Sequence, residues 1–205
     1  IEEGKLKWSL IHFWPGNAIS IAAQNPLPVN EWVHVTVSSD GSSRAAGLEV
    51  YVNGHLANVE VVKDHLSREI TGGGGDTIAL GERFRDRGFK DGMVDDFRVF
   101  NRRLSSLESM SVFDQAAAIS ILKAPTESLD KQQQEELFDC FLANNEAWNQ
   151  HLSDLQKVRM ELAAFNDGLK EIMVMQELPE PKKAYVLFRG EYSQRRDEVV
   201  GGTPA

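Results

Sequence analysis

The chain has 205 residues, enough for one large domain or two small ones, and its net charge of −9 is unevenly spread. Residues 1–103 hold 12 Lys/Arg and 14 Asp/Glu, whereas residues 104–205 hold 10 and 17. An acidic second half argues against nucleic acid and anionic membranes as main partners, and no apolar run approaches the roughly 18 residues of a membrane span. The single cysteine, Cys140, excludes an intrachain disulfide, and its helical context predicts a buried thiol.

The first half of the chain is predicted to form short antiparallel strands. Apolar residues alternate with polar ones in short bursts, and turns that contain Gly or Pro separate these bursts. Asn53-Gly54 tolerates the two positive φ angles of a type I′ turn, so the strands on either side of it are expected to form a tight hairpin. Strands at this spacing predict a sandwich with Trp32 in its core. The expected strands are Leu6–Leu10, Ile19–Ile21, Trp32–Val37, Leu48–Val52, Leu56–Val62, Ile78–Gly81 and 94–100.

The pattern changes from strand to helix near residue 104. Ser105 precedes Glu108 by three, which is the spacing of a capping box that opens a helix. One helix is expected to run from there to Pro125, and a second one covers residues 128–143. A third, over residues 146–172, has an apolar stripe with spacings of three and four.

The second and third of these helices are predicted to form an antiparallel hairpin with Asn144-Asn145 at its turn. On this basis Leu162→Ala is expected to destabilise the fold by roughly 2–4 kcal/mol, while Gln133→Ala, off the seam, is expected to be nearly silent. The predicted seam contains Leu137, Phe141, Trp148, Leu155, Leu162 and Leu169, the last four at spacings of seven.

Five stretches of the first half, in this order, resemble the laminin-G-like, concanavalin-A-like jelly roll. The resemblance implies a concanavalin-A-like β-sandwich, which the α-helical hairpin follows. The family domain usually has several more strands before Trp32 than this chain supplies, so either the first part of the sandwich is missing or the fold is trimmed. The five stretches are Trp32-Val33-His34-Val35, Asp40-Gly41, Leu48 to Gly54, Ile78 to Gly81 and Gly92 to Ser105.

The last part of the chain resembles the junction of large planctomycete cytochrome-c-associated multidomain proteins. This resemblance implies an interior piece of an exported protein that carries haem c elsewhere, since no C-x-x-C-H occurs here. The expected domains are a sandwich over residues 1–103, a helical extension over 104–172, and a tail over 173–205 that leads to a further domain. The resembling pieces are Met173 to Glu177, Tyr185 to Tyr192 and Val199 to Pro204.

Asp95 and Asp96 are the candidate metal ligands, because the resemblance implies a structural calcium near the final strand of the jelly roll. Calcium takes six to eight oxygen ligands, and adjacent residues of a strand point to opposite faces, so at most one of the two reaches a shared site. The alternative is that Asp95 accepts backbone hydrogen bonds while Asp96 is solvated.

Trp14 and a basic cluster are the candidate ligand-binding residues. Trp14 lies beside the Pro15-Gly16 turn and offers a stacking face for a sugar. The cluster of Arg83, Arg85 and Arg87 suits an anionic sugar or an acidic partner segment. The alternative for the cluster is a solvated loop in which acidic residues alternate with the basic ones.

The sequence contains no recognisable catalytic constellation. Retaining glucanases need two carboxylates about 5–5.5 Å apart, and the E-x-D-x-E type of strand that carries them is absent. We therefore expect a non-enzymatic recognition module for polysaccharide that also contacts neighbouring domains of its parent protein. Two alternatives stay open: a structural spacer that positions those domains, and a carbohydrate-active enzyme.

Overall fold

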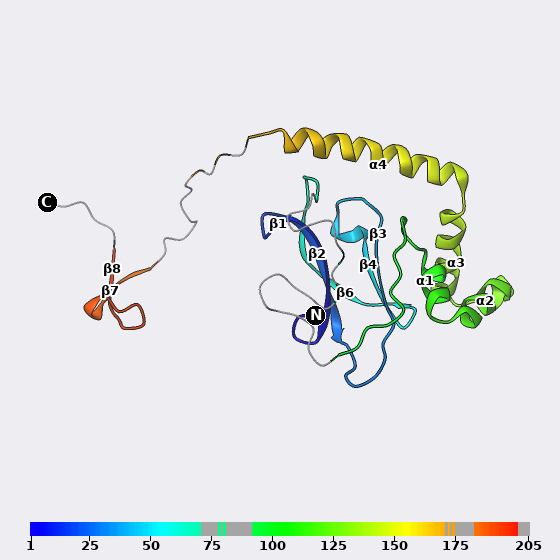
Figure 1. The fold of residues 1–205 in the computed structure, drawn as a ribbon, viewed down its shortest axis with the longest axis horizontal. Coiled ribbons are helices and arrows are strands. Elements are labelled where there is room, and N and C mark those ends of the chain that lie inside the picture. The colour runs from blue at the N-terminus through cyan, green and yellow to red at the C-terminus, as the bar shows by residue number, and fades with distance from the viewer. Residues whose placement is uncertain are drawn as a thin grey trace. The chain divides into compact units, whose positions relative to one another are not determined.

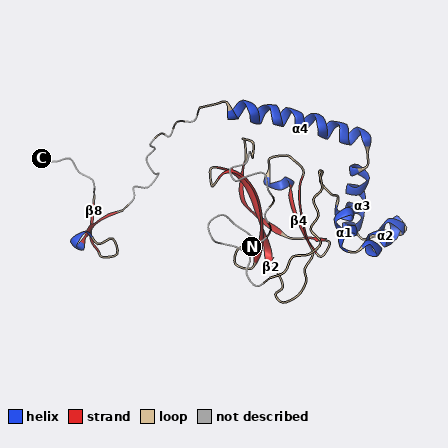
Figure 2. Cartoon of the chain, in the orientation of Figure 1, coloured by secondary structure: helices blue, strands red, loops and turns tan. Residues whose placement is uncertain are grey.

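The computed structural model describes residues 1–70, 78, 80, 92–170, 172, 174 and 183–200. Contacts within the chain divide it into two units, Ile1–Leu169 and Lys170–Ala205. In the first unit the strands come first and the helices follow (Figures 1 and 2). Among the described helices, none combines the length and the hydropathy that a membrane span requires.

The first sheet has three antiparallel strands in the order β1-β2-β6. Trp8 of β1 lies opposite Ile21 of β2, and Ile21 lies opposite Val61 of β6. The residues that link β1 to β2 are Trp14, Pro15 and Gly16, at the turn that the sequence predicts. The strands are β1 (Lys5–Phe13), β2 (Asn17–Pro26) and β6 (Val59–His65).

The second sheet has the order β3-β4-β5. Its strands are β3 (Val35–Ser39), β4 (Leu48–Val52) and β5 (His55–Leu56). A short 3-10 helix, η1 (Ala45–Gly47), precedes β4. Asn53 and Gly54 join β4 to β5 with φ angles of 48° and 79°, which confirms the predicted turn. The strand after this turn is shorter than expected. It leaves the second sheet after Leu56, and the chain then joins the first sheet as β6.

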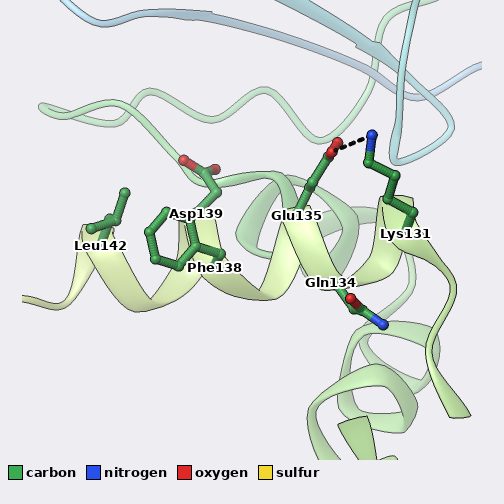
Figure 3. Close-up of a pocket in the computed structure, with 6 residues that line it drawn as sticks. All are labelled: Lys131, Gln134, Glu135, Phe138, Asp139 and Leu142. Carbon is green, nitrogen blue, oxygen red and sulfur yellow. Dashed lines mark ion pairs between the residues drawn. The ribbon is translucent and has the colours of Figure 1, made fainter. Parts of the chain in front are cut away.

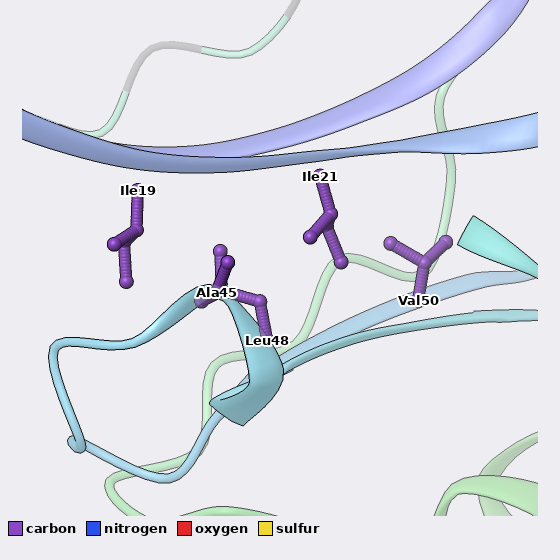
Figure 4. Close-up of a cluster of buried hydrophobic side chains, with 5 residues drawn as sticks. All are labelled: Ile19, Ile21, Ala45, Leu48 and Val50. Atoms are coloured by element: carbon purple, nitrogen blue, oxygen red, sulfur yellow. The ribbon is translucent and has the colours of Figure 1, made fainter. Parts of the chain in front are cut away.

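The two sheets share a core of small and branched side chains. Ile19 and Ile21 point from β2 toward Ala45, Leu48 and Val50 (Figure 4), and none of these five is more than 4% exposed. This alternation along β2 and β4 is the period-two pattern that the sequence displays. The partly buried side chains around the core are Leu6, Trp8, Leu10, Val52, Ala57, Val59 and Leu66.

Within the described residues, four α-helices follow β6. The expected single helix up to Pro125 is two helices, because Asp114 has extended φ and ψ of −137° and 95° and caps the second one. A second core, formed by Leu107, Met110, Ala118, Ile121 and Leu129, packs the first two helices together. The helices are α1 (Ser106–Phe113), α2 (Gln115–Lys123), α3 (Lys131–Ala143) and α4 (Glu146–Asp167), with a 3-10 helix η2 (Thr126–Ser128) before α3.

Two strand predictions are wrong. Trp32 is 63% exposed rather than in the core, because β3 begins only at Val35 and Trp32 lies in the preceding loop. The segment 94–100 is not a strand: Asp96 has a φ of 50°, which interrupts an extended backbone, and each residue from 94 to 100 is exposed. Ile78 and Leu80 are described outside any strand, and the other residues of that predicted strand lie outside the described part.

The predicted helix seam is also wrong, although the helix ranges and the Asn144-Asn145 turn are close to the prediction. Phe141 of α3 is 60% exposed, and Leu155 and Leu162 of α4 are 43% and 59% exposed. Leu137 packs instead against the core of α1 and α2. The two helices do not pack along this seam because α3 directs its buried side toward α1 and α2.

The second unit contains an antiparallel hairpin of β7 (Ala184–Leu187) and β8 (Arg195–Val199), with a 3-10 helix η3 (Phe188–Gly190) between them. Arginine side chains lie over its aromatic rings: the guanidinium of Arg196 is 4.2 Å from the ring centroid of Phe188. This cation–π contact lies beside the connection between β7 and β8 and joins the two strands there.

Gly54 provides a test of how the β4–β5 turn packs. Its φ is +79°, and an added Cβ would come within 3.2 Å of the Met110 Cα and of the Phe113 ring in α1. We expect Gly54→Ala to lower the free energy of unfolding by about 2–3 kcal/mol, from backbone strain plus the close approach. Gly4→Ala is the control, because its φ of +77° is similar and its nearest contact is an ordinary 3.5 Å. Equal losses in urea denaturation would contradict a packed turn.

The predicted capping box is confirmed, and it makes stability depend on pH. Ser105 Oγ accepts a hydrogen bond from the Glu108 backbone N–H, and Glu108 accepts one from the Ser105 N–H at 2.9 Å. The hydrogen bond from Arg102 lowers the pKa of Glu108, and the Ser105 N–H adds to this, while partial burial opposes it. A lowered pKa contributes stability that is present above the unfolded value of about 4.3 and is lost as pH falls through the folded value.

We therefore expect Glu108→Gln to lower the free energy of unfolding by about 0.5–1 kcal/mol at pH 7, and by less as pH drops below about 4. Denaturation at several pH values measures the difference. Glu127→Gln, at an exposed position of η2, is the control variant. A second box in α3 corrects the expectation for Gln133, because its side chain accepts from the Asp130 N–H at 3.1 Å. We therefore expect Gln133→Ala to destabilise the fold rather than to be nearly silent.

Candidate functional site

A charged cluster joins the second sheet to the helices. The Arg103 guanidinium donates to both carboxylate oxygens of Glu49 in β4, at 2.6 and 3.1 Å, and to Asp139 in α3 at 2.9 Å. Burial alone would lower the pKa of Arg103, but the hydrogen bonds to Glu49 and Asp139 raise it above its ordinary value. The arginine therefore stays charged, and it bridges two carboxylates that would otherwise repel each other.

Tyr51 lies beside this cluster and is fully buried. Its hydroxyl is 3.2 Å from Ser106 Oγ, and burial raises the pKa of Tyr51 to about 12. Asp139 also accepts a hydrogen bond from the Ser106 N–H at 3.0 Å, which places a carboxylate at the first turn of α1. Every polar group here has a structural partner, so this cluster holds the helices on the sheet.

The β1–β2 turn presents an exposed aromatic surface. Phe13 is 67% exposed and Trp14 is 42% exposed. The Lys7 ammonium lies 5.1 Å from the centroid of the Trp14 ring and is also paired with Glu2 at 2.7 Å. The cation over one side of the ring orients the indole while leaving part of its surface open to a ligand.

Asp95 and Asp96 lie on the exposed segment 92–100 and form a local arrangement. The Asp96 N–H donates to Asp95 Oδ1 at 2.8 Å, and Arg98 donates to both carboxylate oxygens of Asp96 at 2.9 and 3.0 Å. In the part of the chain that the structure describes, no group of three or more His, Cys, Asp or Glu gathers as a metal site would require. These residues alone do not fit calcium, which needs six to eight oxygens. Calcium binding stays a prediction.

The structure describes three of the predicted site residues, Trp14, Asp95 and Asp96. Arg83, Arg85 and Arg87 lie outside the described residues. Trp14 lies at the β1–β2 turn, and Asp95 lies on the exposed segment 92–100. The exposed ring of Trp14 agrees with its predicted role as a stacking surface. The sequence analysis did not identify Lys7, which lies over that ring. The alternation of β1 could have suggested Lys7, but only the side-chain contact in the structure shows that Lys7 and Trp14 meet.

A solvent-exposed groove runs along α3 and is a second candidate surface. The sequence analysis did not predict this groove. One part, of about 400 Å³, is lined by Lys131, Gln134, Glu135, Phe138, Asp139 and Leu142 (Figure 3). The adjoining part, of about 520 Å³, is bounded by residues of α2 and α3 such as Leu122 and Phe141. The rings of Phe138 and Phe141 stack with centroids 6.3 Å apart, and each residue is 60% exposed.

A laminin G family model, described as the concanavalin A-like lectin/glucanases superfamily, matches residues 2–108. The chain belongs to this superfamily. The match covers both sheets of the first unit and ends within α1. It does not extend to α3 and α4.

A crystal structure of an S-layer domain-containing protein (residues 221–444) from Clostridium thermocellum is similar to the chain, with 17% identity and a TM-score of 0.31. The aligned region covers 54% of this chain and 64% of the solved chain. No curated protein matches the chain at a significant level.

The Arg103 cluster gives a test of how this superfamily domain holds its helices. Arg103→Met retains the side-chain stem but leaves Glu49 and Asp139 without their cation. We expect a loss of about 1–3 kcal/mol in the free energy of unfolding. Arg102→Met is the matched control, because its side chain is 56% exposed and its pair with Glu108 is worth about 1 kcal/mol or less. Equal effects of the two variants in urea denaturation would contradict the structural role of Arg103.

Proposed function

We propose that this chain is a non-enzymatic recognition module that binds polysaccharide at the β1–β2 turn. The observation that carries the proposal is the Trp14 ring, 42% exposed and oriented by the Lys7 ammonium. The superfamily is compatible with carbohydrate recognition. A sugar ring packs its C–H face on an indole while its hydroxyl groups stay hydrated, and an indole held in place loses little side-chain entropy on binding.

The basic side chains of the superfamily domain suit an anionic polysaccharide. Lys7 lies beside the indole, and the sequence places Arg83, Arg85 and Arg87 in the same superfamily domain. Cationic side chains bind carboxylate or sulfate groups through charge-assisted hydrogen bonds. We propose that these groups supplement stacking on Trp14 rather than replace it.

The parent protein is proposed to be a larger exported one. The superfamily membership is compatible with an extracellular location. The resemblance of residues 173–205 to the planctomycete junction supports the placement of this chain between other domains. The absence of an E-x-D-x-E strand from the sequence supports a binding role rather than hydrolysis.

A structural spacer is the second candidate, and the Arg103 cluster favours it. Glu49 and Asp139 come from the sheet and from α3, and one guanidinium holds both. Such a joint fixes the direction in which α3 leaves the sheet, as a segment that positions neighbouring domains requires. A spacer would need no ligand at Trp14, so a binding measurement separates the two functions.

Binding of the intact chain to a glycan array, followed by calorimetry on the best anionic polysaccharide, tests the proposal. We expect Trp14→Ala to weaken binding at least about tenfold, the effect of losing roughly 1.4 kcal/mol at a central aromatic contact. Trp32→Ala is the control, since Trp32 is 63% exposed in the loop before β3. Absence of binding across the array, or equal loss in both variants, would contradict the proposal and favour the spacer.

A further inference from the structure

The β7–β8 hairpin of the second unit concentrates arginine in a part of the sequence that is otherwise acidic. Residues 104–205 carry 17 Asp/Glu against 10 Lys/Arg. They contain four arginines, and three of these, Arg189, Arg195 and Arg196, lie within the hairpin. The hairpin is therefore the element of the second half that is best suited to meet an anion.

Two of the guanidinium groups share one aromatic ring. The Cζ atom of Arg196 lies 4.2 Å from the ring centroid of Phe188, and that of Arg189 lies 5.2 Å from the same centroid. The ring gathers the two cations, because the distance between them cannot exceed the sum of these two distances. A cation–π contact orients a guanidinium and leaves its N–H groups available as donors.

No carboxylate among the described residues neutralises these cations. None of the three arginines of the hairpin forms an ion pair, or donates a hydrogen bond from its guanidinium, within the described part of the chain. Glu198 pairs instead with Lys183 at 3.1 Å, and Glu191 accepts a hydrogen bond from Gln194. Asp197 is exposed. The N–H groups of the arginines are thus left for water or for an anionic ligand.

The backbone of Arg189 places its side chain at a tight turn. Arg189 and Gly190 have φ angles of 50° and 76°, and the Glu191 N–H donates to the Phe188 carbonyl at 3.0 Å, as in a type I′ turn. Gly, Asn and Asp adopt a positive φ more readily than arginine does. An arginine at this position therefore favours a role for its side chain.

We infer that Arg189 and Arg196, gathered around Phe188, bind the sulfate or carboxylate groups of an anionic polysaccharide. A guanidinium donates two parallel N–H bonds to an oxyanion, and a side chain already held on a ring loses less entropy on binding. The acidic second half opposes double-stranded DNA more strongly, since DNA carries about one charge per 1.7 Å. The site belongs to the second unit, so the inference goes beyond the proposed binding at Trp14 and does not rest on it.

Isothermal titration of the intact chain carrying Trp14→Ala tests this site, because that substitution removes the aromatic contact proposed at the β1–β2 turn. The probes are dextran sulfate and polygalacturonate, and uncharged dextran is the control. We expect at least one anionic polymer to bind with a Kd below about 1 mM at low ionic strength, and dextran not to bind. The polymer that binds more tightly identifies sulfate or carboxylate as the preferred group. Failure of both to bind overturns the inference and leaves the proposal for Trp14 to its own test.

Substitutions in the same background locate the binding site. Arg196→Gln and Arg189→Gln should each weaken binding at least about tenfold, through the loss of charge-assisted hydrogen bonds. Arg195→Gln is the matched control and should weaken binding less than about threefold, because Arg195 lies over a different ring, 5.3 Å from the centroid of Tyr185.

Arg196→Lys separates anion binding from damage to the hairpin. It keeps a cation for the ring of Phe188 but loses the planar fork, so its affinity should fall between those of the Arg196→Gln variant and the unsubstituted site. Equal losses in Arg195→Gln and Arg196→Gln would indicate a general charge effect and overturn the inference. Tighter binding of a DNA duplex than of either polysaccharide would overturn the assignment of the ligand.

Discussion

Arg103 links three parts of the chain that are far apart in the sequence. Glu49 belongs to the second sheet and Asp139 to α3, and both carboxylates face each other across one guanidinium. Without a cation between them, two partly buried carboxylates would repel, and each would lose hydration without compensation. The outer side of β4 is thus polar where it meets the helices, while its inner side carries Leu48 and Val50 into the apolar core.

Local signals were predicted well because each depends on a few neighbouring residues. The pair Asn53-Gly54 predicts two positive φ angles, and the pair Ser105 and Glu108 predicts two reciprocal hydrogen bonds. The segment 94–100 has strand-like composition, but a strand also needs a neighbour for its backbone groups, and a single residue, Asp96, interrupts the extended backbone. Composition alone cannot supply that information.

The surroundings of Trp14 and the packing of α3 and α4 were predicted less well, because they depend on contacts that local sequence does not specify. Trp14 was found from its place beside a turn, but the cation over its ring comes from a side-chain contact between residues seven apart, which no local motif predicts. Leu155 and Leu162 have a repeat that specifies a helical seam, and a repeat does not name the partner. Leu137 was assigned to that seam and lies in the core of α1 and α2 instead, because the short helices need α3 to bury their apolar sides. The spacing of apolar residues predicts that one face of a helix will be buried. The topology of the chain determines which element buries it.

The passage of the chain from β5 to β6 bears on how the protein folds. β1–β2 and β3–β4–β5 pair sequence neighbours, whereas β6 returns to β2, and His65 lies opposite Ala18. Bringing β6 back to β2 closes a long loop, and its entropy cost precedes the hydrogen bonds between the two strands. We therefore expect the two local sheets to form first and β6 to complete the first sheet afterwards. The Ala45 N–H donates to Asp64 at 2.8 Å, so this last strand also fixes η1 of the opposite sheet. Substitutions in β6 should consequently accelerate unfolding while leaving the folding rate nearly unchanged.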